Sequence, residues 1–208
     1  MDTGLRHRQK QARRERIVAA ALDLFTERGY DAVRIVDVAH AAEVSPGTVY
    51  NYFPTKEDLV LGGSGDFERA LVDALASRPA HQPLVRAFRE FTLHTRGALA
   101  QPDQAPVRAI ARHARVIADS AALRLRVRRD FDRCTESVAE LVAAERGPAV
   151  TPDQAWVIAN AMIGVTRTMQ RIVHRLAIAD RPVAEIAAAV MAEGERALDQ
   201  LEAGIGAG

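Results

Sequence analysis

The chain has 208 residues, of which 48% are apolar and 26% charged, a composition typical of soluble globular proteins. This length allows one or two domains with buried cores. The net charge is only +1, so the overall charge does not indicate a nucleic-acid partner. The sequence has no secretory signal and no run of roughly 18 apolar residues, and its one cysteine, Cys134, excludes an intrachain disulfide. We therefore expect a cytoplasmic protein without a membrane segment.

Positive charge is concentrated near the N-terminus. Residues 6–16 contain six basic side chains and one acidic side chain, a local charge of +5, whereas residues 1–61 contain nine of each. One interpretation is contact with nucleic-acid phosphates, for which Arg14 is a candidate. The alternative is a solvated tail, which is how most charge runs behave. Residues 1–9 are polar, and we expect them to be frayed.

Two helices are predicted next. Helical spacing of apolar residues predicts the first over residues 11–28, with Gly29 at the C′ position, and the second over residues 33–41. The inner face of the first helix is predicted to consist of Ile17, Ala20, Ala21, Leu24 and Phe25.

Residues 39–53 have the pattern of a helix-turn-helix unit. Ser45 at the N-cap and Pro46 at the first helical position predict the start of a short helix. The small Ala39 and the apolar Val49 can fill the inside corner where two helices cross. In such units the second helix enters the major groove of DNA.

The other sides of this short helix suit contacts with bases and phosphates. They carry Gly47, Thr48, Tyr50 and Asn51. Asparagine can form two hydrogen bonds with adenine, threonine and tyrosine can bond bases or phosphates, and glycine permits close backbone approach. The alternative is an ordinary exposed helix surface. Tyr52 is either a core residue or a phosphate contact, and Lys56, at the start of the next helix, can reach a phosphate.

The segment from Glu15 to Val60 contains AAALDLFTERGYDA followed by VSPGTVYNYFPTKEDL. It resembles the DNA-binding domain of the TetR family of bacterial transcriptional regulators. Val33 stands where that family often has a threonine or serine that caps the second helix and bonds a phosphate, and Arg34 is the candidate replacement. Glu43 stands where many members have glycine, so a residue with a Cβ must adopt the turn conformation at a cost of about 1 kcal/mol.

These observations and the resemblance together give ten candidate DNA-binding residues. They are Arg14, Arg34, Ser45, Pro46, Gly47, Thr48, Tyr50, Asn51, Tyr52 and Lys56.

Residues 62–65, with the sequence GGSG, are the least expected feature. In the resembling family this region lies in a long helix that runs into the ligand domain. Each glycine inside a helix costs about 1 kcal/mol relative to alanine. Either the helix breaks here, or the glycines permit bending between domains.

The remainder of the chain is predicted to be helical, with no segment that alternates like a strand. Helices are expected over residues 67–76, 84–99, 107–118, 121–146, 152–176 and 183–201, followed by a disordered tail from residue 203. The predicted fold class is all-α. Residues 1–61 would form a three-helix helix-turn-helix DNA-binding domain and residues 62–204 a helical effector-binding and dimerisation domain.

The resemblance implies two roles for the C-terminal helices. Apolar stripes along the last two would form a four-helix homodimer interface, which places two DNA-binding units on half-sites about one DNA turn apart. The alternative for each stripe is packing within the chain. A small-molecule effector would bind among the middle helices, between apolar walls with a few polar groups.

Ten residues are candidates for this effector site, although each could instead be a core or surface residue. They are Phe88, Phe91, His94, Thr95, His113, Trp156, Asn160, Thr166, Met169 and Gln170. Arg112, Arg167 and Arg171 are candidates to pair with an acidic ligand or to be solvated.

The sequence shows no catalytic constellation. Its six histidines are scattered, and Cys134 is expected to be a core residue rather than a reactive thiol. We expect neither a metal nor a cofactor. The predicted function is a ligand-responsive repressor that binds a palindromic operator as a homodimer. The alternatives are a constitutive DNA-binding protein without an effector and, in a different class, an α-helical enzyme.

Overall fold

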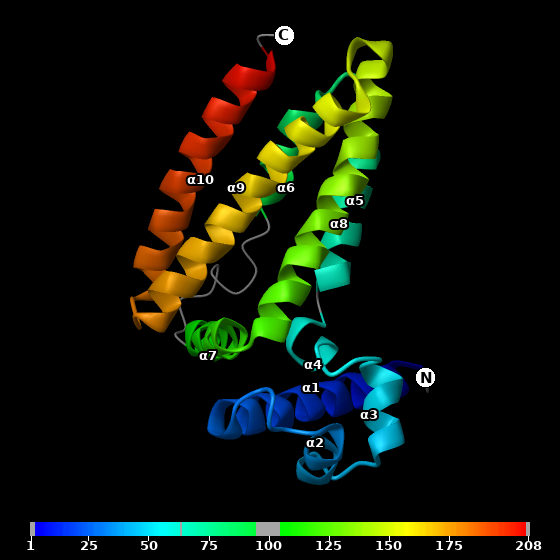
Figure 1. Ribbon diagram of the computed structural model, residues 1–208, viewed down its shortest axis with the longest axis vertical. Coiled ribbons are helices and arrows are strands. Elements are labelled where there is room, and N and C mark those ends of the chain that lie inside the picture. Colours follow the sequence, from blue (N-terminus) through cyan, green and yellow to red (C-terminus); the bar gives the residue numbers. More distant parts are fainter. Residues whose placement is uncertain (1–2, 63, 95–104, 207–208) are drawn as a thin grey trace. The chain divides into compact units, whose positions relative to one another are not determined.

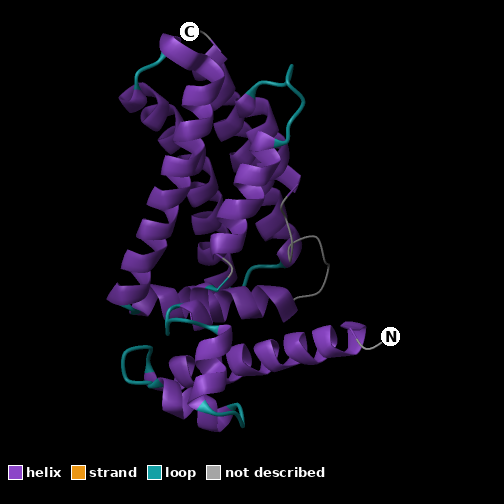
Figure 2. Cartoon of the chain, turned by 90° about the vertical axis from the view of Figure 1, so that its right-hand side faces the viewer, coloured by secondary structure: helices purple, strands orange, loops and turns teal. Residues whose placement is uncertain are grey.

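Every regular element in the residues described by the computed structural model, 3–62, 64–94 and 105–206, is a helix (Figures 1 and 2). The predicted all-α fold class is confirmed. In chain order the elements are α1 (Thr3–Arg28), α2 (Ile35–Ala41), α3 (Pro46–Tyr52), α4 (Asp58–Leu61), α5 (Ser64–Ala76), α6 (Leu84–His94), α7 (Ala105–Asp119), α8 (Ala121–Arg146), the 3-10 helix η2 (Gly147–Ala149), α9 (Pro152–Ile178) and α10 (Val183–Gly206).

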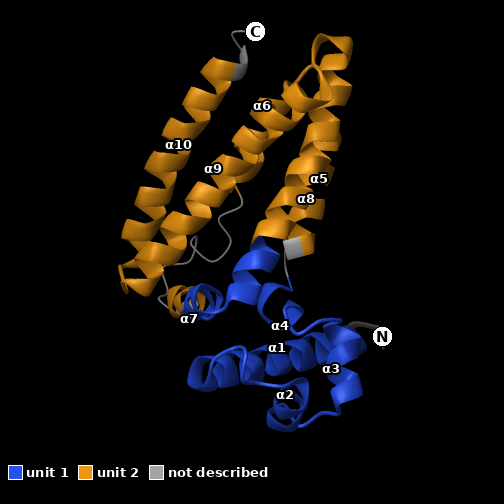
Figure 3. Cartoon of the chain, viewed as in Figure 1, with its two compact units in different colours: residues 1–63, 112–127 blue, residues 64–111, 128–208 orange. Residues whose placement is uncertain are grey.

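The chain forms two compact units (Figure 3). Unit 1 consists of residues 1–63 and 112–127, and unit 2 of residues 64–111 and 128–208. Residues from α7 and α8 therefore pack with the N-terminal helices. The division into a DNA-binding and an effector-binding domain at residue 61 stays a prediction about function.

The core of unit 1 lies where one face of α1 meets the next three helices. Ile17, Ala21 and Phe25, spaced four residues apart along α1, are at most 2% exposed. They belong to a cluster with buried side chains from the other elements, which are Val38, Ala39, Val49, Phe53, Leu59, Val60, Val116 and Leu123. This inner face of α1 agrees with the prediction from the sequence.

At its N-terminal end, α1 is longer than predicted. It begins at Thr3, so the expectation of frayed residues is wrong for residues 3–9. The prediction relied on apolar periodicity, which these residues lack, but Arg, Gln, Lys and Ala have high intrinsic helix propensity. Farther along the same helix, Gln11 Nε2 donates a hydrogen bond of 2.8 Å to Glu15 Oε1, an i, i+4 contact that stabilises the helix.

The helix breaks at the glycine-rich segment, because α4 ends at Leu61 and α5 begins at Ser64. A Cβ added to Gly62 would lie 2.5 Å from the Asp58 carbonyl oxygen and 3.2 Å from Arg14 Nη2, whereas one added to Gly65 would meet no atom within 4 Å. Close packing therefore explains the glycine at position 62. A hinge in this segment stays a prediction.

Unit 2 contains the long helices α9 and α10, which run side by side in opposite directions (Figure 1). A Cβ on Gly194 of α10 would lie 2.9 Å from the methyl group of Met169 in α9, so the two helices approach closely at this glycine. The predicted start of α9 is confirmed, because Thr151 Oγ1 accepts a hydrogen bond from the Gln154 amide. Buried side chains from α5, α6, α7 and α8 complete the core of this unit.

The boundaries of the C-terminal helices are close to those predicted, and α8 spans residues 121–146 as expected. The last helix continues to Gly206, so the expectation of a disordered tail is wrong for residues 203–206. The structure describes α6 as far as His94, and the predicted continuation over residues 95–99 lies outside the described part of the chain.

Candidate nucleic-acid interface

The start of α3 has the geometry predicted for the second helix of a helix-turn-helix unit. Ser45 is the N-cap, and its Oγ accepts a hydrogen bond of 3.1 Å from the Thr48 amide. Pro46 occupies the first helical position, where no backbone amide is needed. Val49 and Phe53 are buried, so one face of α3 packs against the other helices of unit 1 and the opposite face is exposed.

The turn between α2 and α3 is closed by backbone hydrogen bonds and has a left-handed residue. The Val44 amide donates to the Ala39 carbonyl at 2.9 Å, and Glu43 has a φ of 53°. The prediction that a residue with a Cβ adopts the turn conformation at position 43 is confirmed. From α1, Arg16 Nε donates to the Ala42 carbonyl at 3.1 Å and ties the turn to the first helix.

We expect Glu43→Gly to stabilise unit 1. A side chain at positive φ is strained by about 1 kcal/mol, although part of the gain is offset because glycine has more freedom in the unfolded chain. The expected increase in the free energy of unfolding is therefore about 0.5–1 kcal/mol, measurable by urea denaturation. The control is Ala122→Gly, at an exposed position of α8, which should instead lose about 1 kcal/mol. A loss at both positions would contradict the strain at Glu43.

The exposed face of α3 presents most of the predicted contacts together. Pro46, Gly47 and Asn51 are exposed, and the Tyr50 side chain is 51% exposed. Thr48 is partly buried, with its hydroxyl 2.9 Å from Ser45 Oγ. This face therefore offers an amide, a phenol and a bare backbone to a partner.

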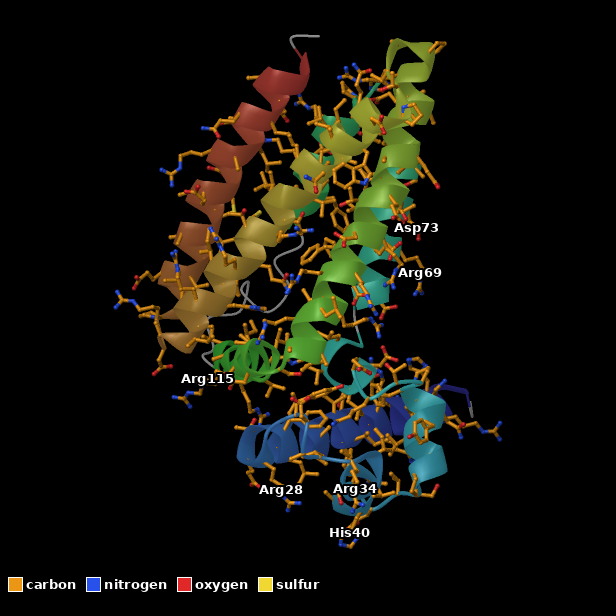
Figure 4. The ribbon with its side chains drawn as sticks, viewed as in Figure 1. Arg28, Arg34, His40, Arg69, Asp73 and Arg115 are labelled. Atoms are coloured by element: carbon orange, nitrogen blue, oxygen red, sulfur yellow. The ribbon has the colours of Figure 1, made fainter. Side chains whose placement is uncertain are left out.

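At the start of α2, Arg34 rather than Val33 is the N-cap residue. Val33 precedes this N-cap residue and is 1% exposed in the core of unit 1. An apolar residue before the N-cap often packs against its helix in this way. The Arg34 amide donates to Asp37 Oδ2 at 2.8 Å, and this bond is the main reason that the pKa of Asp37 is lowered. The Arg34 side chain is 79% exposed, and Figure 4 shows it among the outward-pointing side chains of unit 1.

Two predicted phosphate contacts have internal partners in the structure. Lys56 Nζ donates to the Tyr30 carbonyl at 2.5 Å and lies 4.1 Å from the centre of the Tyr30 ring. Burial lowers the pKa of Lys56. The Arg14 guanidinium lies 5.1 Å from the centre of the Phe53 ring, and Nη2 donates to the Gly62 carbonyl at 3.5 Å. The roles of both cations in DNA binding stay predictions, as does that of the partly buried Tyr52.

Residues 17–62, from the buried face of α1 to the end of α4, match the family model described as bacterial regulatory proteins, tetR family. This segment is a TetR-family domain.

Curated relatives of the chain are transcriptional regulators. TcmR of Streptomyces glaucescens is 33% identical over 85 residues, which cover 41% of this chain and 38% of TcmR. The repressor KstR of Mycolicibacterium smegmatis is 42% identical over 72 residues, 34% of each chain. RutR of Escherichia coli K12 is 32% identical over 133 residues, 64% of this chain and 49% of RutR. The chain thus spans between about a third and a half of the length of these curated relatives.

Solved structures share the fold over nearly the whole chain. A putative TetR-family transcriptional regulator from Syntrophomonas wolfei has a TM-score of 0.59 at 23% identity, and the match covers 91% of this chain and 96% of that regulator. Salmonella enterica GusR has a TM-score of 0.56 at 17% identity, covering 92% and 94%. At these identities the likeness shows the fold alone.

The predicted effector residues are divided between the two units. His113 lies in unit 1, whereas the other described candidates lie in unit 2. The His113 ring is hydrogen-bonded to the Val60 backbone. The pKa of His113 is lowered, mainly by burial. Thr95 lies outside the described residues. The side chains of four further candidates are exposed, and these are His94, Trp156, Asn160 and Gln170.

The remaining candidates are buried or partly buried in unit 2. Phe88 and Met169 are buried, and Phe91 packs with its ring centre 5.8 Å from that of Phe67. The Thr166 hydroxyl is buried and has no hydrogen-bond partner among the described residues. The Thr92 hydroxyl in α6 is also buried without a hydrogen-bond partner among the described residues. Thr92 was not among the predicted effector residues, although it follows Phe88 by four residues and so lies on the same helix face.

The arginines considered for an acidic ligand have carboxylate partners in two of three cases. Arg167 lies 3.7 Å from Asp132 and above the Phe131 ring, and Arg112 is paired with Asp23. Arg171 is exposed. Pairing of this kind within the chain reduces the charge that is available to a ligand.

Cys134 is buried, and burial is the main cause that raises its pKa to about 11. A neutral, buried thiol is a poor nucleophile, so the structure agrees with the core interpretation. Within the described part of the chain, no cluster of His, Cys, Asp or Glu could hold a metal ion. None of the described helices combines the length and apolar character needed to cross a membrane.

Proposed function

We propose that this chain is a DNA-binding transcriptional regulator, acting as a ligand-responsive repressor that binds a palindromic operator as a homodimer in the cytoplasm. The exposed face of α3, supported from behind by buried Val49 and Phe53, is the observation that carries the proposal. A short helix held in this way presents its outer side chains to the major groove. Repression is supported by KstR, a named repressor that is 42% identical over 72 residues.

The homodimer would form through α9 and α10. Two apolar side chains near the start of α9 are exposed in the single chain, Trp156 at 45% and Val157 at 62%. A second copy that covered them would remove their apolar surface from water, which favours association. Two-fold symmetry would then place two copies of α3 on the two half-sites of a palindrome.

The effector would bind in unit 2, where α6 and α9 each bury a hydroxyl that has no hydrogen-bond partner in the described part of the chain, beside aromatic and sulfur-containing side chains. Thr92 and Thr166 are the polar groups, and Phe88, Phe91 and Met169 are the apolar ones. A buried hydroxyl without a partner costs about 1–3 kcal/mol, which a bound ligand could recover. If no small molecule lowers operator affinity in a broad screen, the constitutive DNA-binding alternative is favoured.

Asn51→Ala tests the proposed role of α3. Loss of two hydrogen bonds to one base should change the preference at a single position of each half-site by about 1–3 kcal/mol. Selection from random duplex DNA, followed by competitive binding of single-base variants, measures this preference. The expected result is a relaxed preference at that position with the rest of the selected sequence retained.

The matched control is Asn160→Ala, measured without effector. Asn160 is the only other asparagine and is exposed in unit 2, so the selected sequence should not change. Equal weakening of all sequences by Asn51→Ala would show that this amide does not contact a base. Failure of the wild-type protein to select any sequence would contradict the proposed function itself.

A further inference from the structure

The helix α9 carries a row of positive charge that its own sequence does not balance. Between residues 154 and 179 it has three arginines, Arg167, Arg171 and Arg175, and no acidic residue. Their spacing of four residues places them along one side of the helix. Arg175 lies in the last turn, where the helix dipole favours a cation. This explanation does not apply to Arg167 and Arg171, which precede the last turn.

The ion pair made by Arg167 shows which part of α8 lies opposite this row. Its Nη2 lies 3.7 Å from Asp132 Oδ1 in α8, and its guanidinium lies 5.0 Å from the centre of the Phe131 ring. Residues 147–151 join α8 to α9, and the two helices run in opposite directions (Figure 1). Asp132 and Arg167 therefore lie at the same level of this helix pair.

One turn farther from the connection, both helices carry an arginine. Arg171 follows Arg167 by four residues, and Arg128 precedes Asp132 by four residues, so each lies on the side of its helix that makes the ion pair. Both side chains are exposed, and neither has an ion-pair partner within the described ranges of the chain. Figure 1 shows α8 and α9 diverging in this direction. Unit 2 therefore presents two opposed cations from separate helices.

The inner side of α9 at this level belongs to the proposed effector site. Thr166 directly precedes Arg167, and Met169 lies two residues before Arg171. The Thr166 hydroxyl is buried without a hydrogen-bond partner among the described residues, and Met169 is 9% exposed. Phe131, beneath Arg167, packs against the same core. The cations thus border an apolar surface that contains one polar group without a partner.

Cations at the edge of an apolar surface favour one class of ligand. Guanidinium groups are weakly hydrated and bind carboxylates and sulfonates through charge-assisted hydrogen bonds. Apolar side chains favour a ligand that removes apolar area from water. A small inorganic anion would gain only the first interaction and a neutral apolar molecule only the second, whereas an amphipathic anion gains both.

We propose that the effector is an amphipathic organic anion, with its charged group between Arg128 and Arg171 and its apolar body against α9. The inference rests on the proposed function and names the chemical class of the effector. Arg167 has a supporting role, because its pairing with Asp132 offsets the negative charge that would repel such a ligand. Arg128 was not a candidate from the sequence, because only the pairing of α8 with α9 places it opposite Arg171.

Two fluorescent probes with the same ring system isolate the role of the ligand charge. Anilinonaphthalenesulfonate is an amphipathic anion, and phenylnaphthylamine is its neutral counterpart without the sulfonate group. The fluorescence of both probes increases in apolar surroundings, so titration gives an affinity for each. Arg128→Gln and Arg171→Gln should each weaken binding of the sulfonate about 10-fold, because a hydrogen bond to a charged group is lost. Binding of the neutral amine should not change.

Arg69→Gln is the matched control, because it removes the same charge from another exposed site in unit 2. Figure 4 shows Arg69 pointing outward from α5. This variant should bind both probes as the wild type does. Asp132→Asn should have the opposite effect to the two test variants, since it removes the acidic group and releases Arg167, and affinity for the sulfonate should rise about 3-fold. Circular dichroism can verify that all four variants remain helical.

Three results of the titrations would overturn the proposal. Equal weakening by Arg69→Gln would indicate general attraction to the charge of the chain. Equal loss of affinity for both probes would show that the two arginines act through the fold of unit 2. Unchanged affinity for the sulfonate in Arg128→Gln and Arg171→Gln would show that these cations do not hold the charged group.

Operator binding separates this proposal from the proposed function. The sulfonate should lower the affinity of the wild-type protein for its selected operator, and Arg171→Gln should require about 10-fold more of it for the same effect. Release by the neutral amine alone, or binding of the sulfonate without release, would overturn the assignment of the effector class while the repressor function stands. A wild-type protein that selects no sequence would be a failure of the proposed function, and the probe titrations would still decide whether the two arginines bind an amphipathic anion.

Discussion

Phe53→Ala is expected to unfold unit 1 or to leave it only marginally stable. Phe53 is 1% exposed, is the C-cap residue of α3 and lies beneath the Arg14 guanidinium. Removing a buried phenyl ring costs about 3–5 kcal/mol, from lost burial and from the cavity that remains. This loss is comparable with the whole stability of a small domain. Chemical denaturation followed by circular dichroism measures the change, and specific DNA binding should be lost with the fold.

Phe53→Leu is the control, since it keeps most of the apolar volume and should cost about 1–2 kcal/mol. It also removes the ring from beneath Arg14. If Phe53→Ala changed the free energy of unfolding by less than 1 kcal/mol, the ring would not be the core group that the structure shows. Retained folding with lost DNA binding would instead assign Phe53 a direct role in the interface.

Gly62→Ala and Gly65→Ala are expected to have effects of opposite sign. An added methyl group at position 62 would be forced against the Asp58 carbonyl oxygen, with Arg14 and Phe53 also close. Backbone atoms cannot move aside as a flexible side chain can, so we expect a loss of about 1–3 kcal/mol. Position 65 is open and lies in α5, so alanine there should be neutral or stabilise by at most about 1 kcal/mol.

Urea denaturation and operator affinity, measured on both variants, separate the two explanations of the glycine-rich segment. If packing alone accounts for the glycines, only Gly62→Ala impairs stability and binding. A stable Gly65→Ala variant that binds operator normally but no longer responds to an effector would support the hinge. Equal destabilisation by both substitutions would contradict the open surroundings of Gly65.

Local features of unit 1 were predictable because the signals that determine them are local. The Ser45 cap and the strained turn at Glu43 depend on the backbone within a few residues, and both appear as expected. The helical N-terminal turns were missed because apolar periodicity detects only helices that bury a face. Residues 6–13 bury no such face, and their helix follows from propensity.

The contacts of the cations could not be predicted in the same way. Whether Lys56 points to solvent or to the Tyr30 ring is decided by a turn 26 residues away in the sequence. The same holds for Arg14 and the Gly62 carbonyl, 48 residues apart. In unit 2, the sequence showed which residues were aromatic or polar but not which would be buried. Thr92 was therefore missed, and His94, on the same helix, was included although it is exposed.

The distribution of fluorophores follows the two units. All three tyrosines, Tyr30, Tyr50 and Tyr52, lie in unit 1, and the single tryptophan, Trp156, lies in unit 2. Selective excitation of tryptophan therefore reports on unit 2, whereas tyrosine emission originates in unit 1. Denaturation of the unlabelled wild-type chain, followed by both signals, gives one transition curve for each unit. Coincident curves mean that the units unfold as one cooperative system, and separated curves mean that unit 1 has a stability of its own.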